Sequence, residues 1–503
     1  MGVLESVVLG TYLGVLVILA LMGSHRFVAL FLYYRHRERR AKPVPLPSPL
    51  PRVTIQLPLY NEKYVVDRLL DSVAQIRYPR HLLDIQVLDD STDETVAITA
   101  TAIKRLRAAG LDIDHVRRES RVGYKAGALD AGLRTAKGEL ILIFDADFLA
   151  PADILEKTVG HFSDPTVAVV QARWGHVNRE FSLLTRVQAM LLDGHFVVEH
   201  GARSRAGRFF NFNGTAGVWR RAAIEDAGGW QHDTLTEDLD LSYRAQLRGW
   251  RFVYLPDLVS EAEVPVEMSA FKAQQQRWAK GSIQTCLKIL PRVLATEELP
   301  WYVKAEATFH LTANLAYPLM VLLSLLVFPA MIIRYNMGWV EMVVVDLPLF
   351  VCATASVCAF YVVSQREITK AGLWHRVSVL PAALAVGIGL SISNSKAVIE
   401  ALLGHSSEFA RTPKFRVEGK GDEWRRKAYR GSLSAVPFIE LALGAYFSYV
   451  AYYVLVSGLF GALPFIVLFQ GGFLYTGALS VTQVGWAWRL PERRRSSQVA
   501  IRS

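Results

Sequence analysis

The chain has 503 residues, of which 51% are hydrophobic and 20% are charged, and its mean hydropathy is +0.22. This composition is too apolar for an ordinary soluble enzyme and too charged for a chain lying wholly in a membrane, and it excludes a disordered or fibrous protein. The formal net charge is +10, but the basic residues crowd beside apolar stretches, which favours an anionic membrane surface over nucleic acid as a partner.

The first apolar stretch runs from Val7 to Tyr34 and is long enough to cross a bilayer. The basic sequence RHRERRAK follows it at residues 35–42. Because cationic loops stay in the cytoplasm, we expect an uncleaved transmembrane anchor with its amino terminus outside. Residues 1–42 would form this anchor and a basic linker.

A domain of a different kind is expected over residues 43–295, where short β-rich runs alternate with helical stretches. Four apolar runs predict buried strands at 53–59, 84–90, 139–147 and 167–174. Such runs imply a mostly parallel, doubly wound α/β sheet of the Rossmann-like kind. The three cysteines form neither a disulfide framework nor a CxxC metal pair, so we expect this domain to lie in the reducing cytoplasm.

Polar side chains gather where the first three of these strands end. Ligands of doubly wound sheets bind beyond the carboxyl ends of the strands. The residues expected there are Tyr60, Asn61, Glu62, Asp89, Asp90, Asp145 and Asp147. Two carboxylates on an extended strand end suit a hard divalent cation, Mg²⁺ or Mn²⁺, that bridges phosphate oxygens. A helix capping box at Ser91 to Glu94 and a surface turn at residues 145–147 are the structural alternatives.

Three further segments carry candidate chemistry. Lys125 could place a point charge on phosphates, or be an ordinary surface lysine. The glycine-rich segment 210–220 indicates a close approach of the backbone to another group. The sequence Thr236-Glu237-Asp238 opens a helix; Thr236 could be only its N-cap, and Asp238 could be a general base.

The sequence QQQRW at 274–278 is expected on an amphipathic helix at the membrane surface. Trp278 could anchor that helix in the membrane interface or form a platform on which a sugar stacks.

The remainder of the chain, 296–503, is expected to be a membrane region. Apolar segments recur at about 306–333, 342–363, 378–404, 434–457 and 460–484. The loops on both sides of the segment 378–404 are basic, and both should face the cytoplasm. We therefore expect 378–404 to be an interfacial or re-entrant helix, which leaves five spans in the whole chain. A sixth span with an atypical loop is the alternative.

In their order and spacing, Asp89-Asp90, the DxD of Asp145 and Asp147, the TED at 236–238 and QxxRW at 274–278 form a family pattern. It resembles that of the membrane-embedded family 2 glycosyltransferases, which include cellulose, hyaluronan and chitin synthases. The resemblance is closer still to the plant cellulose-synthase-like mannan and glucan synthases. It rests on the segments QVLDDSTDET, GYKAGAL, IFDADF, VQARW, FNGTAGVWR and GWRFVYL. The resemblance covers residues 51 to 290 and continues more weakly beyond them.

The resemblance implies a GT-A fold and an inverting transfer of a hexose from a nucleoside diphosphate sugar to a growing β-linked polysaccharide, which passes through the spans. It implies GDP-mannose or UDP-glucose as donor and Asp238 as catalytic base, within the motif of Thr236 and Glu237. The implied donor-binding residues are Tyr60, Glu62, Asp89, Asp90, Lys125, Asp145, Gln274 and Arg277, with Asp145 and Asp147 on the metal. Trp278, Gly214 and Thr215 are assigned to the acceptor.

A basic loop at 405–430 resembles the FxVTxK gating loop of cellulose synthases through Phe409, Thr412 and Lys414, although Arg411 and Pro413 depart from that pattern. Transfer of a single sugar to a ceramide or polyprenyl acceptor is the enzymatic alternative. A transporter or a membrane receptor would leave the acidic strand ends without a role. The short tails favour a bacterial plasma membrane over the Golgi, and the oligomeric state is left open.

Overall fold

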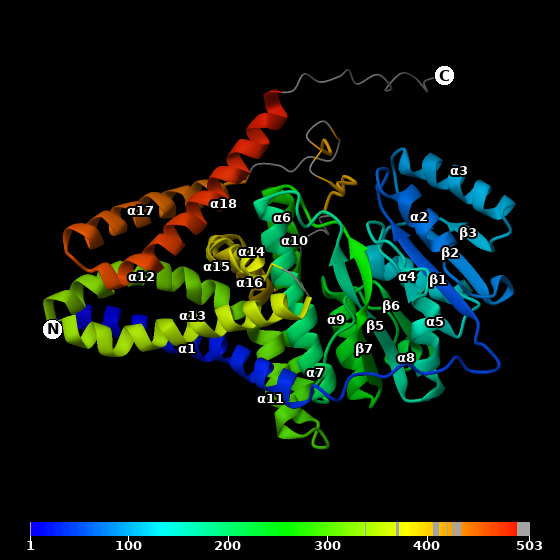
Figure 1. Cartoon of the computed structure of the whole chain (residues 1–503), viewed down its shortest axis with the longest axis horizontal. Helices are drawn as coiled ribbons and strands as arrows, with labels where there is room; N and C mark the ends of the chain where they lie inside the picture. The colour runs from blue at the N-terminus through cyan, green and yellow to red at the C-terminus, as the bar shows by residue number, and fades with distance from the viewer. Residues whose placement is uncertain are drawn as a thin grey trace.

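The computed structural model describes residues 2–337, 339–368, 372–405, 412–419, 421–424, 427 and 434–489 (Figure 1). For residues 336–337, 339–347, 375–376 and 484–489 the structure describes the backbone alone.

One half of the molecule is built on a seven-stranded sheet of order β3-β2-β1-β4-β6-β5-β7. All four predicted strands are present, and β6 is antiparallel to both of its neighbours. The remaining strand pairs are parallel. The strands are β1 (Val53–Leu59), β2 (Leu83–Asp89), β3 (Ile113–Val116), β4 (Leu140–Ile143), β5 (Val167–His176), β6 (Gly217–Arg220) and β7 (Arg251–Ala262).

The sheet carries a hydrophobic core on each face. In β4, Leu140 and Leu142 face one core, whereas Ile141 and Ile143 face the other. Successive side chains of a strand point to opposite faces, so a strand covered on both sides must be apolar throughout. The helices of this half are α2 (Val66–Ala74), α3 (Thr95–Ala108), α4 (Tyr124–Thr135), α5 (Ile154–Thr158), α6 (Leu183–Asp193), α7 (Gly201–Arg205), α8 (Arg221–Asp226) and α9 (Glu237–Leu247).

The run predicted as a strand over 139–147 is extended only from Leu140 to Ile143. Its antiparallel partner β6 begins at Gly217, which pairs with Ile143, so the ladder has no partner beyond that point. Asp145 and Asp147 therefore lie in the turn that follows β4 and not on an extended strand end. This corrects the expected local geometry of the two carboxylates.

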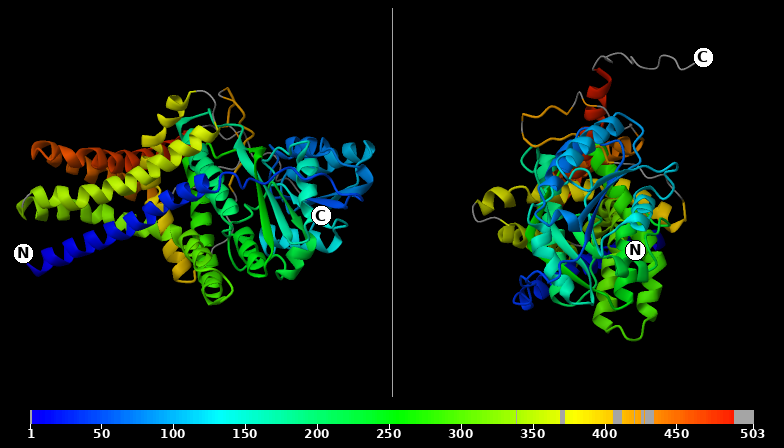
Figure 2. Two further views of the ribbon diagram at one scale, coloured as in Figure 1. Left: turned by 60° about the horizontal axis from the view of Figure 1, so that its bottom comes forward. Right: turned by 90° about the vertical axis from the view of Figure 1, so that its right-hand side faces the viewer.

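The other half is helical. Its long helices run side by side and away from the sheet, with the amino terminus at their far end (Figures 1 and 2). Its helices are α1 (Val3–Arg35), α10 (Met268–Ala295), α11 (Trp301–Thr312), α12 (Ala316–Met337), α13 (Trp339–Ile368), α14 (Leu373–Val377), α15 (Leu380–Gly389), α16 (Ser391–Leu402), α17 (Val436–Val456) and α18 (Leu463–Arg489).

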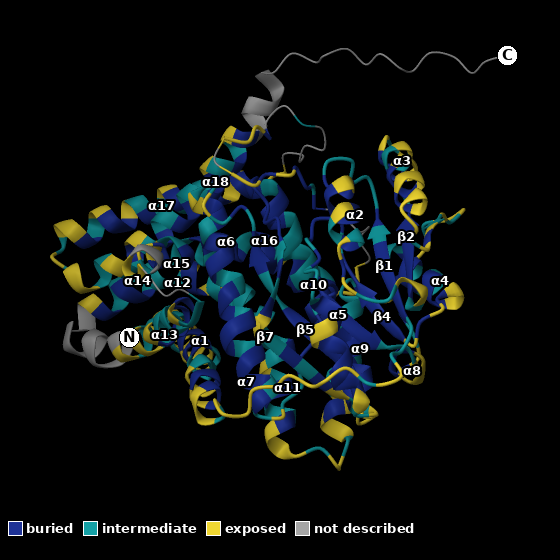
Figure 3. Ribbon diagram, turned by 45° about the vertical axis from the view of Figure 1, so that its right-hand side comes forward, coloured by how far each residue is buried: buried dark blue, intermediate teal, exposed yellow. Residues whose placement is uncertain are grey.

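Five candidate membrane spans are found among the described residues: Val3–Arg35, Trp301–Tyr335, Pro348–Ile368, Val436–Val456 and Phe460–Gln483. Helices α15 and α16 are bent by 44° relative to each other, and together they would make a sixth span. The predicted segment 378–404 is therefore not one straight helix, and its re-entrant nature stays a prediction. Large apolar side chains such as Tyr452 and Val456 are exposed on α17, where lipid would cover them (Figure 3).

Helix α10 joins the two halves. Lys272 donates to Glu440 of α17 at 2.5 Å, and the backbone N–H of Met268 donates to Gln483 of α18 at 2.7 Å. These contacts hold the first turns of α10 against the membrane helices, so its next turns can face the carboxyl ends of the strands.

Candidate active site

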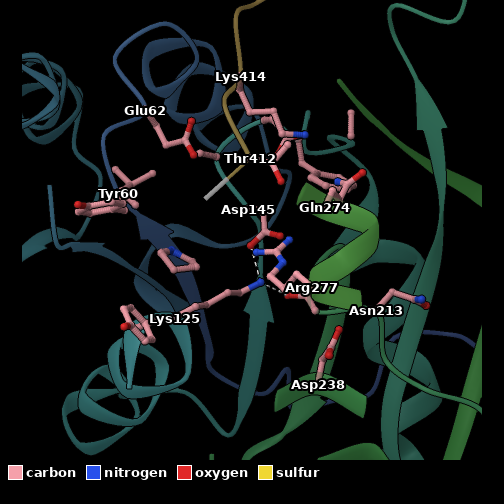
Figure 4. Close-up of a pocket in the computed structure, with 18 of the residues that line it drawn as sticks. Tyr60, Glu62, Lys125, Asp145, Asn213, Asp238, Gln274, Arg277, Thr412 and Lys414 are labelled. Carbon is pink, nitrogen blue, oxygen red and sulfur yellow. Dashed lines mark hydrogen bonds and ion pairs between the residues drawn. The ribbon is translucent and has the colours of Figure 1, made fainter. Parts of the chain in front are cut away.

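A cavity of about 190 Å³ lies between the carboxyl ends of β1, β2 and β4 and the side of α10 (Figure 4). The predicted site residues that line it are Tyr60, Glu62, Asp90, Lys125, Asp145, Asp147, Gly214, Thr236, Glu237, Asp238, Gln274, Arg277, Trp278, Thr412 and Lys414. Asp89 and Thr215 lie behind its wall, and Phe409 falls outside the described residues. Segments from both halves of the chain thus meet around one cavity.

Asp89 and Thr215 support the wall from behind. Asp89 accepts a hydrogen bond from the backbone N–H of Ser91 at 2.9 Å and lies 2.8 Å from Nε2 of His115. Burial opposes ionisation of Asp89, but the hydrogen bonds from His115 and Ser91 lower its pKa. The hydroxyl oxygen of Thr215 accepts from the backbone N–H of Asp145 at 2.8 Å, which fixes the turn after β4.

Neither of the two helix caps considered for these motifs makes a side-chain capping hydrogen bond. Ser91 accepts a hydrogen bond from the backbone of Asn61 at 2.8 Å, and α3 begins four residues later with Glu94 as its N-cap residue. Thr236 occupies the N-cap position of α9, but its hydroxyl pairs with that of Thr285 on α10 at 3.1 Å. A Cβ on Gly281 would lie 2.6 Å from Cγ2 of Thr236, so α10 approaches the TED segment closely only because residue 281 is glycine.

One end of the cavity has a flat cationic surface. The guanidinium of Arg121 lies 3.3 Å from the ring centroid of Tyr60. Arg118 binds Asp90 through two nitrogens, at 3.0 and 2.5 Å. A planar ligand ring could stack on the guanidinium, and the fixed carboxylate could accept hydrogen bonds from the edge of that ring.

Lys125 stands in the middle of the cavity. Its ammonium lies 2.5 Å from Asp145 and donates to the carbonyl oxygen of Gly214 at 2.9 Å. Burial disfavours the charge, but Asp145 and Glu237 outweigh it and raise the pKa of Lys125. Lys125 is therefore a permanent positive charge at the place where a phosphate could bind.

Asp238 faces Lys125 and Gly214 across the cavity. Burial, followed by the neighbouring charge of Glu237, raises the pKa of Asp238 to about 7. Gly214 has a φ of +80°, and a Cβ there would lie 3.0 Å from Oδ2 of Asp238. The glycine therefore leaves open the space in front of a carboxylate that can accept a proton near neutral pH.

The two carboxylates expected to hold a metal are both paired with lysines. Asp145 lies 2.5 Å from Lys125, and Asp147 lies 2.7 Å from Lys414. Within the described ranges, no group of three or more His, Cys, Asp or Glu residues could enclose a metal ion. Two carboxylates are still a donor set that fits Mg²⁺ or Mn²⁺, because such ions take their other ligands from water and substrate phosphates.

The loop that resembles a gating loop is fastened to the sheet domain. The carboxylate of Glu263, at the end of β7, accepts from the backbone N–H groups of Phe415 at 3.1 Å and Arg416 at 2.8 Å. Glu418 pairs with Arg68 at 2.8 Å. Glu263 and Phe415 are more than 150 residues apart in the sequence. Their contact brings Thr412 and Lys414 into the cavity wall.

Helix α10 supplies the opposite wall. Gln274, Arg277 and Trp278 all line the cavity, and Gln276 donates to the carbonyl oxygen of Ser393 on α16 at 3.2 Å. Burial lowers the pKa of Arg277, and the first carboxylate that opposes this effect is Glu237. Since Trp278 lines the cavity, its ring is close enough to contact a bound substrate.

The sequence analysis did not single out several other residues of the cavity, among them Arg121, Trp174, His176 and Asn213. Trp174 and His176 end β5, and the rule that polar residues follow apolar strands could have identified them. Asn213 precedes Gly214 directly, so the glycine-rich segment was a signal for it. Arg121 had none, because its contact with Tyr60 depends on tertiary structure.

Comparisons with known proteins agree with these observations. Residues 51–281 match the family described as glycosyltransferase like family 2. The chain is 42% identical over 262 residues to glucomannan 4-beta-mannosyltransferase 2 of Arabidopsis thaliana, covering 51% of this chain and 49% of that protein. It is 32% identical over 458 residues to probable glucomannan 4-beta-mannosyltransferase 9 of Oryza sativa subsp. japonica. That alignment covers 85% of this chain and 82% of the rice protein. For three of the curated relatives, the matched region covers only 43% to 50% of the relative's own length.

Among solved structures, the chain resembles mannosyltransferase PcManGT from Pyrobaculum calidifontis, in complex with GDP-Man and Mn2+. The TM-score is 0.52 at 23% identity, covering 78% of this chain and all of that one. This likeness confirms the predicted GT-A fold. The chain therefore belongs to glycosyltransferase family 2, among the membrane-embedded, cellulose-synthase-like enzymes related to the glucomannan 4-beta-mannosyltransferases.

Proposed function

We propose that the protein transfers mannose from GDP-mannose to the end of a growing β-linked glycan of the mannan type, with UDP-glucose and a glucan as the other pairing. The observation that carries this proposal is the single cavity in which Asp238 faces Lys125, Asp145 and Arg277. The relatives are named glucomannan 4-beta-mannosyltransferases, which supports mannose and a β-1,4 linkage.

In the proposed mechanism, Asp238 accepts the proton of an acceptor hydroxyl. The hydroxyl oxygen forms a bond to C1 of the donor sugar as the bond from C1 to the diphosphate breaks, and attack from the opposite face converts an α to a β configuration. Lys125 and Arg277 stabilise the negative charge that grows on the leaving diphosphate. A pKa near 7 suits Asp238 to this role, because half of the carboxylate is ready to accept a proton at neutral pH.

Asp145 and Asp147 are proposed to hold Mg²⁺ or Mn²⁺, and the ion would neutralise charge on the diphosphate when bound. Lys125 and Lys414 occupy these carboxylates in the structure. Donor binding would draw the two ammonium groups toward phosphate oxygens and free the carboxylates. Tyr60, Glu62 and Asp90, with Arg121, are proposed to bind the nucleoside, and Asp89 to act from behind.

In the proposed organisation, residues 1–42 are an anchor with its amino terminus outside, 43–295 the catalytic domain in the cytoplasm, and 296–503 the membrane region. The basic residues 35–42 support this orientation. Helix α16 packs against α10 beside the cavity, so the membrane helices through which the glycan would pass begin next to the site. Thr412 and Lys414 would close the cavity over the donor.

The test is a panel of sugar nucleotides offered to the purified full chain with manno- and cello-oligosaccharide acceptors. We expect release of GDP from GDP-mannose and a β-1,4-linked product by linkage analysis. The absence of turnover with every donor would contradict an enzymatic function of this site.

Transfer of one sugar to a lipid acceptor is the second candidate, supported by the exposed apolar faces of the membrane helices. Trp278→Ala separates the two functions. If Trp278 grips a polymer end, the variant should make shorter products while its first addition is slowed less. Unaltered product length would return Trp278 to anchoring, and a product of one sugar on lipid would favour the second candidate.

A further inference from the structure

A π-helix connects the membrane half to the glycine-rich segment of the cavity. It runs from Gly194 to His200, directly after α6. A Cβ on Gly194 would lie 2.4 Å from Cε1 of Phe360, so this segment is pressed against α13. π-Helices are rare and are often found at functional sites.

The π-helix carries a hydrogen-bonded chain that ends at the cavity. Nδ1 of His195 lies 2.9 Å from Oε2 of Glu199, and Nε2 of His195 lies 3.0 Å from Nδ2 of Asn213. Although burial opposes ionisation, His195 and then Arg203 lower the pKa of Glu199 well below its usual range. Glu199 is therefore an acceptor, and it fixes the ring proton on Nδ1 of His195. Nδ2 of Asn213 can only donate a hydrogen bond, so Nε2 of His195 accepts it.

These hydrogen bonds determine which atom of the Asn213 amide remains available to a ligand. Oδ1 of Asn213 is buried and has no hydrogen-bond partner among the described residues. An unpaired buried acceptor costs free energy unless a ligand satisfies it. Asn213 lines the cavity, so the missing donor can come from a substrate.

The position of Asn213 indicates which part of a substrate would supply that donor. Asn213 directly precedes Gly214, which borders Oδ2 of Asp238. In Figure 4, Asn213 and Asp238 lie at the end of the cavity away from Tyr60, with Lys125 and Asp145 between. Asp238 takes the proton of the acceptor hydroxyl in the proposed function, so the acceptor sugar must lie at this end.

We propose that Asn213 binds a hydroxyl group of the acceptor's terminal sugar through Oδ1, and that His195 and Glu199 are positioning residues that hold its amide in this orientation. The inference rests on the proposed glycosyl transfer. A site built to accept a hydrogen bond from one hydroxyl discriminates against sugars that lack it or turn it away. The pair of Asn213 and His195 would therefore contribute to acceptor selectivity without contacting the donor phosphates.

The test compares Asn213→Ala, His195→Ala and the double variant in the full chain, with mannotetraose and cellotetraose as acceptors. Each single variant should raise the KM for the acceptor about tenfold, the loss of one hydrogen bond, and leave the KM for GDP-mannose unchanged. Because the two residues act as a unit, the double variant should be no worse than Asn213→Ala alone. His195→Gln, whose amide oxygen can accept from Asn213, should recover most of the loss.

His161→Ala is the matched control, because His161 is buried in the same domain and does not line the cavity. It should leave both KM values unchanged. Additive effects of the two substitutions, an equal rise in both KM values, or an unchanged acceptor KM would overturn the inference. If the native chain shows no turnover, the proposed function fails separately. Calorimetric titration of the full chain with mannotetraose and GDP then decides the inference, since equal binding by native chain and Asn213→Ala contradicts it.

Discussion

Asp238 combines two features that oppose its charge, burial and the neighbouring carboxylate of Glu237, and together they raise its pKa to about 7. Only the ionised form accepts a proton. The rate of transfer should therefore be full above this pKa and fall about tenfold per pH unit below it. A pH profile of kcat/KM in the presence of saturating metal measures this. A flat profile between pH 5 and 8 would show that a different group is the base.

The same residue gives a substitution test. Asp238→Asn keeps the shape of the side chain and removes its ability to accept a proton, so transfer should fall by about 10² to 10⁴-fold. Binding of the nucleoside diphosphate, measured by calorimetry, should persist. Asp233→Asn, a nearby carboxylate outside the cavity, is the control and should retain the native rate. A normal rate in Asp238→Asn would remove this residue from the mechanism.

Asp147 offers a prediction about the metal. Its carboxylate is 2.7 Å from Lys414, and it would have to exchange this partner for the ion. Asp147→Ala should raise the Mg²⁺ or Mn²⁺ concentration needed for half-maximal activity by about tenfold or more, the loss of one carboxylate ligand. Asp153→Ala, a carboxylate paired with Lys157 outside the cavity, serves as the control. Equal metal titrations for native chain and Asp147→Ala would count against the ligand role.

At the scale of elements, the close approach of α10 to the TED segment is the most sensitive contact. A Cβ on Gly281 would meet Cγ2 of Thr236 at 2.6 Å and the backbone of Leu235 at 2.9 Å. Gly281→Ala should push the two elements apart, cost about 1–3 kcal/mol of unfolding free energy and lower kcat. Gly387→Ala, at a helical glycine with no atom within 4 Å of the added Cβ, should show neither effect. Thermal unfolding and initial rates would measure both.

Four strands could be predicted because strands buried on both faces are continuous apolar runs of distinctive length. The sequence did not predict β3, β6 or β7. β6 is only four residues long, Gly217–Arg220, and antiparallel, so its place between β4 and β5 follows from pairing and not from its own pattern. The π-helix at Gly194–His200 likewise has no periodic signal, because its apolar residues fit an ordinary helix.

The candidate site was predicted to the extent that strand ends determine it. Glu62, Asp90 and Asp145 follow strands and reach the cavity, as parallel topology requires. The ion pairs of these carboxylates could not be predicted. Arg118 reaches Asp90 from a loop and Lys125 reaches Asp145 from a helix, and packing sets both positions. Residue roles remain predictions that the experiments above address.

At the scale of the whole molecule, the ion pair of Lys272 and Glu440 ties α10 to the membrane helices. Both side chains are almost fully buried, at 8% and 0% exposure. Lys272→Met leaves Glu440 without its partner and should lower the unfolding free energy by about 3–5 kcal/mol, whereas Lys272→Met with Glu440→Leu should recover most of it. Lys157→Met, at the partly exposed pair with Asp153, should cost about 1 kcal/mol or less. Thermal unfolding in detergent compares the four proteins; a double variant as unstable as Lys272→Met would contradict this account.

The attachment of Lys125 and Lys414 to the two carboxylates after β4 has an electrostatic consequence for substrate capture. The proposed sugar-nucleotide donor carries negative charge, and two bare carboxylates would repel it at the entrance. With an ammonium already on each, the charge of these two carboxylates is offset, and Arg121 and Arg277 add positive charge elsewhere in the cavity wall. The lysine pairing thus removes the repulsion that these two carboxylates would otherwise exert on an incoming anion.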